Sequence, residues 1–590
     1  MPKPQRWIPR AARAALESVL GVVRAHPGRV VALIATLIYA NTLDNRPVLD
    51  DGWVIFENPL IKSLENVPAI FARPYNVATP TWNNAGLYRP VTTLSYAINY
   101  AIGGRYVVGY HLVNIALHVL CCLLVFELGR RLASAARAEH PDCVALLGAL
   151  LFAVHPVHVE AVTAMVGRAE LLAALGSLGC LYLTCTRSQG RWRYPAGLVA
   201  LALGVLSKEN AAVTPLLFGL VAVTLPEAAG LEARPNSSTE EGRRAAWHVF
   251  ALAAGMAAAV GPYFLLHPGG AGIPIGSQWF QGQPRPVVFY TMTRVVAEYL
   301  RLLVFPHPLG VDFYYAHKIP FTPSFTLTCL AATGLWLTVL AFAITALRRA
   351  PLVALGTLWV FVALLPVLNI IPIGVLMGER LLYLPSVGFC IAVGAGAALL
   401  LRVAWPPRPV VAAGVAVVVL ALAAKSLVRN AEWRTALTLY QAEVRKTPTD
   451  ATLNNNLAVE YTARGQFDLA RQRLEVVLRV APWYWRAHVN MGIVAHRQHD
   501  DSAAMRWLEE AQRIAPNESA PYFFMAVVSA DGGKLTEAVE YLARAEQADP
   551  MDARTHSYRG QYLARLGRAA DAEQELRRAR ELDPALSPGR

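Results

Sequence analysis

Charged residues are scarce in this sequence: Asp, Glu, Lys and Arg make up 16% of its 590 residues. A soluble protein of this size carries about 25% charged residues. The deficit falls between residues 30 and 428, whereas the chain from Asn430 onward is rich in Arg and Glu. This distribution excludes a single soluble domain and indicates two regions that meet two different solvents.

Cysteine is rare as well, and the C-terminal region has none. All seven cysteines fall in or beside apolar runs, with no Cys-x-x-Cys pair and no zinc-finger spacing to His. The sequence therefore predicts neither a disulfide framework nor a metal site, and a divalent metal cofactor is not expected. A Gly-rich nucleotide-binding loop is not evident either.

The net charge of +13 does not gather in one patch, as it would in a nucleic-acid-binding protein. Much of it stands in short connections between apolar runs, so nucleic acid is not an expected partner. The apolar runs predict an all-α polytopic membrane region of about eleven spans. They fall near residues 30–43, 108–128, 143–157, 169–186, 194–207, 210–225, 246–266, 325–347, 351–370, 382–402 and 408–428.

The basic segment 1–29 precedes the first run, and no good cleavage site follows Ala40, so we predict a cytoplasmic segment and a retained first helix. Alternation from there places every strongly basic short connection in the cytoplasm, as the positive-inside rule requires. These connections contain Arg130, Arg131, Arg137, Arg187, Arg191, Arg193, Arg234, Arg243, Arg244, Arg348, Arg349, Arg402 and Arg408.

The long connections 44–107, 155–168, 267–324 and 369–381 then lie outside the cytoplasm. Two further apolar stretches, 90–102 and 287–305, are too short or too charged to span, so we expect helices at the outer surface. The membrane region is predicted over 30–428, with 44–107 as its long outer loop.

The C-terminal region repeats with a period of 34 residues, which is the spacing of Pro448, Pro482, Pro516, Pro550 and Pro584. Small residues recur at the same period, as do leucines; Gly465, Gly533 and Gly567 form another column in which His499 is the exception. The pattern resembles the tetratricopeptide repeat (TPR), a helical hairpin that stacks into a solenoid. We predict a TPR domain over 429–590, with a half-repeat and four full repeats.

One column of the first helices could form a peptide-binding groove for an extended acceptor segment: Asn456, Asn490, Phe524 and Tyr558. Aligned Asn side chains offer donor and acceptor pairs to a peptide backbone. A solvated helix face is an equally good interpretation.

Ionisable residues gather on the predicted outer face. Asp50 and Asp51 are adjacent carboxylates, and mutual repulsion could raise one pKa and create a general base; a solvated turn is the alternative. The cations Arg89, Lys208 and Arg380, which we place near the lipid headgroups, could bind phosphate or simply pair with neighbouring Glu residues. The spacing of His155 and His158 suggests metal, but Pro156 between them argues against a shared helix face. The other members of this set are Glu160, Arg168, Glu170, Glu209 and Glu379.

Several segments together resemble the transmembrane and TPR O-mannosyltransferases, a family similar to the membrane glycosyltransferases with the C-type fold. The segments begin at Asp50-Asp51, Tyr88-Arg89-Pro90, Gly109-Tyr110-His111, Phe152-Ala153-Val154-His155, Val166-Gly167-Arg168, Ser207-Lys208-Glu209 and Glu379-Arg380-Leu381. The resemblance implies an inverting transfer of mannose from a polyprenyl-phosphate donor to Ser or Thr of a protein, with an Asp of the first outer loop as base.

On this hypothesis Asp50, or alternatively Asp51, deprotonates the acceptor, while Arg380, Arg89 and Lys208 stabilise the leaving phosphate. His155, His158, Glu160, Arg168, Glu170, Glu209 and Glu379 would shape the sugar site. The Ala- and Arg-rich composition favours a bacterial source, and hence an inner membrane with the TPR domain in the periplasm. A non-catalytic envelope scaffold and a transporter are the alternatives; charges at span ends and the lack of repeated halves count against the transporter.

Overall fold

In the computed structural model the chain divides into two compact units, Met1–Thr435 and Ala436–Arg590. The structure describes residues 21, 23–75, 87–185, 190, 192–229, 240–266, 280, 282–370, 375–402 and 407–583. Most of the predicted N-terminal segment 1–29 lies outside these residues. Arg187, Arg191 and Arg234 of the predicted cytoplasmic connections and Pro584 of the repeats lie outside them too.

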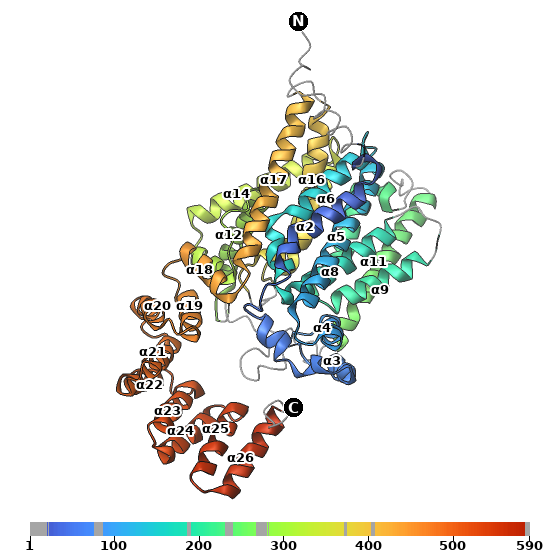
Figure 1. The fold of residues 1–590 in the computed structure, drawn as a ribbon. Helices are drawn as coiled ribbons and strands as arrows, with labels where there is room; N and C mark the ends of the chain where they lie inside the picture. Colours follow the sequence, from blue (N-terminus) through green and yellow to red (C-terminus); the bar gives the residue numbers. More distant parts are fainter. Residues whose placement is uncertain are drawn as a thin grey trace. The chain divides into compact units, whose positions relative to one another are not determined.

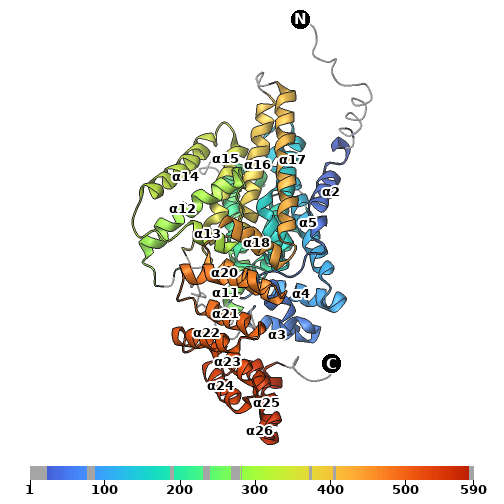
Figure 2. The same cartoon turned by 60° about the vertical axis from the view of Figure 1, so that its left-hand side comes forward.

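The first unit is a bundle of helices, and the described residues contain no strand, so the all-α prediction is confirmed (Figures 1 and 2). Many of the helices begin with proline in the first turn, where the missing N–H costs no hydrogen bond. The helices of ten or more residues are α2 (Pro27–Tyr39), α4 (Pro90–Gly103), α5 (Val107–Ala135), α6 (Pro141–Val154), α8 (Arg168–Thr184), α9 (Arg193–Val205), α10 (Thr214–Thr224), α11 (Glu240–Leu266), α12 (Arg285–Val304), α14 (Leu327–Ala346), α15 (Pro351–Leu364), α16 (Tyr383–Leu400) and α17 (Arg408–Glu432).

Shorter helices connect these, and most of the polar residues discussed below stand on them. The short α-helices are α3 (Val67–Ala72), α7 (Val159–Thr163) and α13 (Asp312–Lys318). The single turns are η1 (Ala40–Thr42), η2 (Gly52–Phe56), η3 (Pro59–Lys62), η4 (Leu64–Asn66), η5 (Pro156–His158), η6 (Met165–Gly167), η7 (Glu209–Val213), η8 (Pro226–Ala229), η9 (Leu365–Val367) and η10 (Glu379–Leu382).

Several apolar helices identify the first unit as part of a membrane protein. Five stretches among the described residues are long and apolar enough to cross a bilayer, and a sixth is added if the pair Pro141–Val154 and Pro156–Thr163, bent by 51°, counts as one span. Four shorter apolar helices coincide with other predicted runs. The count of eleven therefore stays a prediction. The five long stretches are Val107–Ala135, Met165–Thr184, Leu327–Ala346, Glu379–Leu400 and Pro409–Glu432.

Glycine allows α15 and α16 to pack backbone to backbone. A Cβ atom on Gly356 would come 2.3 Å from the carbonyl oxygen of Gly388, and one on Gly388 would come 2.4 Å from the carbonyl oxygen of Gly356. Real Cβ atoms do not approach so closely, so both positions require glycine. This contact holds the helix that follows Arg380 at a fixed distance from its neighbour.

The helix predicted at the outer surface over 287–305 is α12, and it is not among the helices with the composition of a span. Its apolar side, which includes Val295 and Tyr299, belongs to a buried core. On its polar side Glu298 accepts hydrogen bonds from Arg301 and Lys318. Both helices expected at the surface exist, the other being α4; their depth in a membrane stays a prediction.

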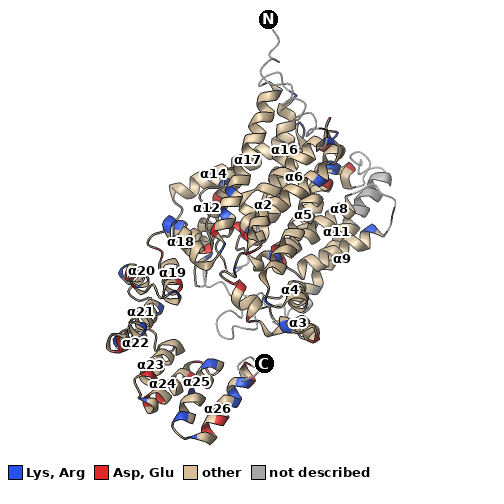
Figure 3. Cartoon of the chain, viewed as in Figure 1, with Lys and Arg blue, Asp and Glu red and all other residues tan. Residues whose placement is uncertain are grey.

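The second unit is a row of helical hairpins. Its helices are α18 (Ala436–Lys446), α19 (Ala451–Ala463), α20 (Phe467–Val480), α21 (Trp485–Arg497), α22 (Asp501–Ile514), α23 (Ser519–Asp531), α24 (Leu535–Ala548), α25 (Ala553–Arg565) and α26 (Ala569–Leu582). The small-residue column faces the leucine column, because a Cβ on Gly492 would come 2.8 Å from Leu508 Cγ. Charged residues recur along these helices, whereas most residues of the bundle helices are uncharged (Figure 3).

The boundary between the units lies at Thr435 rather than at the predicted residue 428. The last turn of α17 belongs to the first unit, because its polar side chains bind there. Ser426 Oγ donates to the Val154 carbonyl oxygen (2.7 Å), and Asn430 Nδ2 donates to that of Ile38 (2.8 Å). The limit of the membrane region at residue 428 stays a prediction, while the compact first unit continues past it because these polar groups are buried there.

The exception in the glycine column has an energetic cost. His499 adopts φ of 65°, beside values of 72°, 80° and 80° for Gly465, Gly533 and Gly567. A residue with a Cβ is strained by about 1–2 kcal/mol in this region, whereas glycine is not.

We therefore expect His499→Gly to stabilise the protein by about 1 kcal/mol, measured as a higher thermal midpoint of the full chain. Gln498→Gly is the matched control, since Gln498 has φ of −93° and gains nothing from glycine. Equal effects of the two substitutions would show that backbone strain at His499 is not the cause.

Candidate active site

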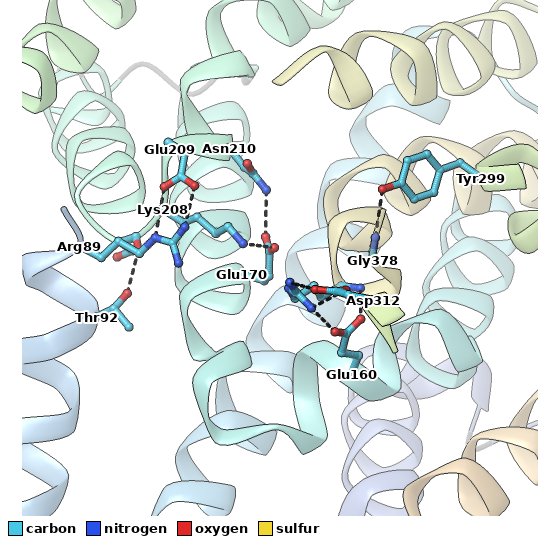
Figure 4. Close-up of polar contacts among 12 residues, drawn as sticks. Arg89, Thr92, Glu160, Glu170, Lys208, Glu209, Asn210, Tyr299, Asp312 and Gly378 are labelled. Carbon is cyan, nitrogen blue, oxygen red and sulfur yellow. Dashed lines mark hydrogen bonds and ion pairs between the residues drawn. The ribbon is translucent and has the colours of Figure 1, made fainter. Parts of the chain in front are cut away.

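Polar side chains from distant parts of the first unit meet in two neighbouring groups (Figure 4). We call them the Arg380 group and the Lys208 group. The Arg380 group consists of Glu160, Asp312 and Arg380, and the Lys208 group of Arg89, Glu170, Lys208, Glu209 and Asn210. The two groups are within electrostatic range of each other, because the charge of Arg380 acts on Lys208.

In the Arg380 group one guanidinium is held by two carboxylates. Arg380 Nη1 and Nη2 donate to Asp312 Oδ1 and Oδ2 at 3.0 and 2.7 Å. Nη1 also donates to Glu160, which accepts a second hydrogen bond from the Arg380 backbone N–H at 2.8 Å. The Glu160 side chain is 3% exposed, so this carboxylate depends on Arg380 for its compensation.

The backbone around Arg380 is shaped for this arrangement. A Cβ on Gly378 would come 2.7 Å from Asp312 Oδ1, so a larger residue at that position would displace the Asp312 carboxylate. The Gly378 N–H donates to the Tyr299 hydroxyl at 3.3 Å. The predicted site residue Glu379 points elsewhere: its Oε1 accepts from the Gly310 N–H and from the Tyr315 hydroxyl, and it thereby fixes the segment that carries Asp312.

The Lys208 group contains two ion pairs. Arg89 donates through Nε and Nη2 to both carboxylate oxygens of Glu209, at 3.2 and 2.6 Å, which leaves its Nη1 as the donor that Glu209 does not engage. Lys208 Nζ contacts Glu170 Oε1, and Asn210 Nδ2 donates to Glu170 Oε2 at 3.2 Å. The start of α4 is fastened here, because Thr92 Oγ1 donates to the Ser207 carbonyl oxygen at 2.9 Å.

The two adjacent aspartates differ in environment. Asp51 is 1% exposed, and its oxygens accept from the backbone N–H groups of Val48 (3.1 Å) and Val166 (2.9 Å), so it joins two outer segments. Asp50 is exposed to solvent. Desolvation by the surrounding protein nevertheless raises the pKa of Asp50. The positive charge of Arg380 opposes this shift, and the negative charge of Glu160 adds to it. Asp50 is therefore the accessible carboxyl within electrostatic range of Arg380, whereas Asp51 is buried and holds Val48 and Val166; a catalytic role of either aspartate stays a prediction.

Burial also raises the pKa of Asp51 to about 7, although hydrogen bonds from Val166 and Val48 oppose the shift. The folded state thus keeps a proton that the unfolded state, with a pKa near 3.9, releases. The free energy of unfolding should consequently fall as pH rises through the window from about 4 to 7, by on the order of 3–4 kcal/mol.

Asp51→Asn should remove this contribution. We expect the thermal midpoint of the wild-type chain to fall more between pH 5 and pH 7.5 than that of the variant. Parallel pH profiles of the two proteins would contradict the assigned pKa.

Three other predicted site residues are buried and bound to the protein. His155 Nε2 lies 3.0 Å from the Leu303 carbonyl oxygen, and His158 lies 2.8 Å from that of Phe152 and 2.7 Å from Ser386 Oγ. Arg168 donates to Asn114 Oδ1 at 2.9 Å and to the carbonyl oxygens of Ser95 and Tyr110. These side chains join buried segments of the first unit to one another; direct contact with a sugar is a prediction that their burial does not favour.

Sequence reasoning missed Asp312, the second carboxylate on Arg380. A signal existed, since Asp312 lies in the predicted outer connection 267–324 and begins α13 beside two tyrosines. Asn210 was missed for another reason: it is next to Lys208 and Glu209, yet its partner Glu170 is 40 residues away. Only the fold reveals these two pairings.

Known proteins resemble this chain in both units. A family model of the tetratricopeptide repeat matches residues 455–519 and 526–587. Protein O-mannosyl-transferase F38B6.6 of Caenorhabditis elegans is 28% identical over 444 residues, covering 72% of this chain and 59% of that protein. Protein O-mannosyl-transferase Tmtc3 of Drosophila melanogaster is 28% identical over 467 residues, covering 69% and 50%. The chain is a homologue of the transmembrane and TPR O-mannosyltransferases.

This homologue spans 59% and 50% of the length of those two curated relatives. Both are animal proteins, so the predicted bacterial source is not confirmed. Among solved structures, the crystal structure of MamA matches 25% of this chain and 88% of its own, with 17% identity and a TM-score of 0.23.

The predicted groove column of this O-mannosyltransferase homologue lies on four first helices of the repeats. Asn490 Nδ2 donates to Asn455 Oδ1 at 2.8 Å, and Asn455 Nδ2 lies 3.5 Å from Asn456 Oδ1, so the amides join neighbouring repeats. Tyr558 is 38% exposed, and its ring packs 5.1 Å from that of Phe523. Phe524 is half-buried. Peptide binding by this column stays a prediction.

One cluster in the repeats offers three potential metal ligands within reach of one another: Glu546, His556 and Glu575. Arg559 Nη1 contacts both carboxylates, and His556 Nδ1 lies 2.7 Å from Glu575. An arginine therefore already supplies the positive charge that a metal ion would bring.

Proposed function

We propose that this protein transfers a sugar, mannose in particular, from a polyprenyl-phosphate donor to Ser or Thr hydroxyls of a protein. The observation that carries the proposal is Asp50: an exposed carboxyl with a raised pKa, within electrostatic range of Arg380 and Arg89. A general base requires an accessible carboxylate, and a raised pKa makes that carboxylate a stronger base. Homology to O-mannosyltransferases supports the same reaction.

In the proposed step the acceptor hydroxyl oxygen attacks the anomeric carbon while Asp50 takes its proton. The bond from that carbon to the phosphate oxygen breaks, and the lipid phosphate leaves with the electron pair. The configuration inverts, because attack and departure occur on opposite faces. Negative charge grows on the phosphate, and Arg380, Arg89 and Lys208 are the cations that would stabilise it. A phosphate is a good leaving group and requires no general acid.

The cations are not bare, which constrains the mechanism. Glu160 and Asp312 hold Arg380, Glu209 holds Arg89, and Glu170 holds Lys208. A donor phosphate therefore shares or displaces a carboxylate. Arg89 Nη1 is the donor that a phosphate can reach without breaking an ion pair, because Glu209 accepts from Nε and Nη2 only.

We further propose that the site and the repeats lie outside the cytoplasm. The four connections predicted there supply Asp50, Glu160, Asp312 and Arg380, which interact with one another. Their assembly in one place supports a common face of the membrane. The repeats would bind the protein acceptor. In a bacterium, this arrangement would place the first unit in the inner membrane and the TPR domain in the periplasm.

The test is a transfer assay with the purified full chain in lipid. A Ser/Thr-rich peptide is incubated with polyprenyl-phosphate mannose or, in parallel, with GDP-mannose, and hexose on the peptide is measured by mass spectrometry. We expect hexose with the lipid-linked donor alone. Transfer from GDP-mannose would overturn the donor assignment, and absence of hexose with acceptors extracted from the native membrane would favour a non-catalytic scaffold.

A further inference from the structure

A second basic site lies at the opposite end of the helices that carry the Arg380 group. Arg380 precedes α16 and Glu160 follows α6, whereas the other ends of these helices border a cavity of about 120 Å³. With a rise of 1.5 Å per residue, the 14-residue α6 extends about 21 Å and the 18-residue α16 about 27 Å. The cavity is thus separated from the candidate active site by most of the thickness of a membrane.

Three chain segments bring cationic or titratable side chains to this cavity. They are the connection from α5 to α6, the connection from α14 to α15, and the C-terminal end of α16. The side chains are Arg137, His140, Arg349 and Arg402, and no residue of its lining is acidic. We call this site the basic cavity.

Two helix N-termini border this cavity; α6 carries Asp142 in its first turn, whereas α15 has no acidic residue there and adds to the positive potential. α6 and α15 begin at Pro141 and Pro351, and neither has a side-chain hydrogen bond at its N-cap. The next N–H groups of a helix start have no partner within the helix, and the aligned peptide dipoles attract anions there. Pro351 and Leu352 of the α15 start belong to the lining itself.

The existing ion pairs at the rim do not block an anion. Arg137 Nη2 lies 2.8 Å from Glu227, and Arg402 Nε lies 3.3 Å from Glu139. The Arg137 side chain is 80% exposed and the Glu139 side chain 63% exposed. Such exposed pairs contribute little, so a phosphate with two negative charges can compete for these cations.

The remainder of the lining is apolar and determines the class of ligand. Val144 of α6, Val353 of α15 and Leu399 of α16 line the cavity below the cations. α16 is one of the helices long and apolar enough to span a bilayer. Cations at the end of spanning helices, directly beside an apolar wall, match a phosphate headgroup with acyl chains attached. One water molecule requires about 10–15 Å³ of cavity volume, so the cavity has room for a phosphate group.

We infer that the basic cavity binds the phosphate headgroup of an anionic membrane lipid on the face opposite the candidate active site. In the predicted orientation that face is cytoplasmic. A comparison of Arg348 with Arg349 distinguishes a specific site from general attraction to positive charge. Both side chains are exposed and adjacent in sequence, yet only Arg349 lines the cavity.

The experiment uses the full chain in nanodiscs of phosphatidylcholine, titrated with phosphatidic acid and read by native mass spectrometry. Arg349→Gln should lower the affinity about fivefold, the effect of one cation at a lipid surface, and Arg349→Gln with Arg402→Gln should lower it further. Arg348→Gln should bind as the wild type does. Both single variants should keep the wild-type thermal midpoint in phosphatidylcholine.

Equal losses in Arg348→Gln and Arg349→Gln would overturn the inference in favour of diffuse surface attraction, as would equal binding by all the variants. Inorganic phosphate is titrated in parallel. If millimolar phosphate displaces the lipid and loses affinity in Arg349→Gln, the cavity is a site for free phosphate and the lipid assignment is overturned. Phosphatidic acid that persists in excess phosphate supports the lipid.

Discussion

Asp50→Asn is expected to lower the rate of sugar transfer by 100- to 10,000-fold, the usual contribution of a general base. Asn keeps the size and the hydrogen-bonding capacity of the side chain but cannot accept the acceptor's proton. Because Asp50 is exposed, the substitution should change the free energy of unfolding by less than about 1 kcal/mol. The measurement is the initial rate of hexose transfer to a Ser/Thr peptide under saturating donor.

Asp44→Asn is the matched control, because Asp44 is an exposed carboxyl of the same outer loop. It should transfer at the wild-type rate. Asp51→Asn should lose both stability and rate, since its carboxylate fastens Val48 to Val166. The roles assigned to the two aspartates would be reversed if Asp51→Asn lost activity with unchanged stability while Asp50→Asn kept the wild-type rate.

Arg380→Gln is expected to destabilise the folded state by about 3–5 kcal/mol, as well as to abolish transfer. The reason is the partner left behind: Glu160 is 3% exposed and would remain as a buried, uncompensated charge. Thermal unfolding of the purified chain in detergent measures the first effect, and the peptide assay measures the second.

The double variant Glu160→Gln with Arg380→Gln separates structure from chemistry. A neutral pair of amides removes the buried charge, so most of the stability should return. Transfer should stay absent, because the cation near Asp50 is gone. Recovery of transfer together with stability would mean that Arg380 acts only as a structural partner of Glu160.

The sequence predicted which outer residues gather, but not how they pair. Arg89, Glu160, Lys208 and Arg380 could be found because charged residues beside apolar runs are unusual and the charge rule placed them on one face. Most of their partners were in the same predicted set, but the pairing could not be predicted, and Asp312 was missed. Glu170 meets Lys208, and Asp312 meets Arg380, only through the packing of helices distant in sequence.

The choice between two adjacent aspartates shows the same limit. Asp50 and Asp51 have nearly the same local sequence, so no local rule separates them. What separates them is the Val166 N–H, which is 115 residues away and binds Asp51. Periodicity, by contrast, predicted the repeats almost completely, including the glycine column, because each hairpin contacts mainly its neighbours.

The predicted span 143–157 is short because the chain bends at this place in the first unit. α6 ends at Val154, and the segment Pro156–Thr163 continues at an angle of 51°. The break occurs at Pro156, which cannot extend the hydrogen-bonding of the preceding turn. The same break turns Glu160 toward Arg380, so an interruption that obscures the hydropathy signal also builds the site.

The carboxylates that hold each cation also bear on what happens after a reaction. A bare cation would retain the spent carrier phosphate strongly, and the site would be inhibited by its own product. Here a carboxylate can pair again with each cation when phosphate leaves, so the affinity for phosphate is the difference in free energy between two ion pairs. These carboxylates are Glu209, Glu170, Glu160 and Asp312. On the proposed function, such a site would release its carrier lipid readily and would turn over in a membrane where spent carrier accumulates.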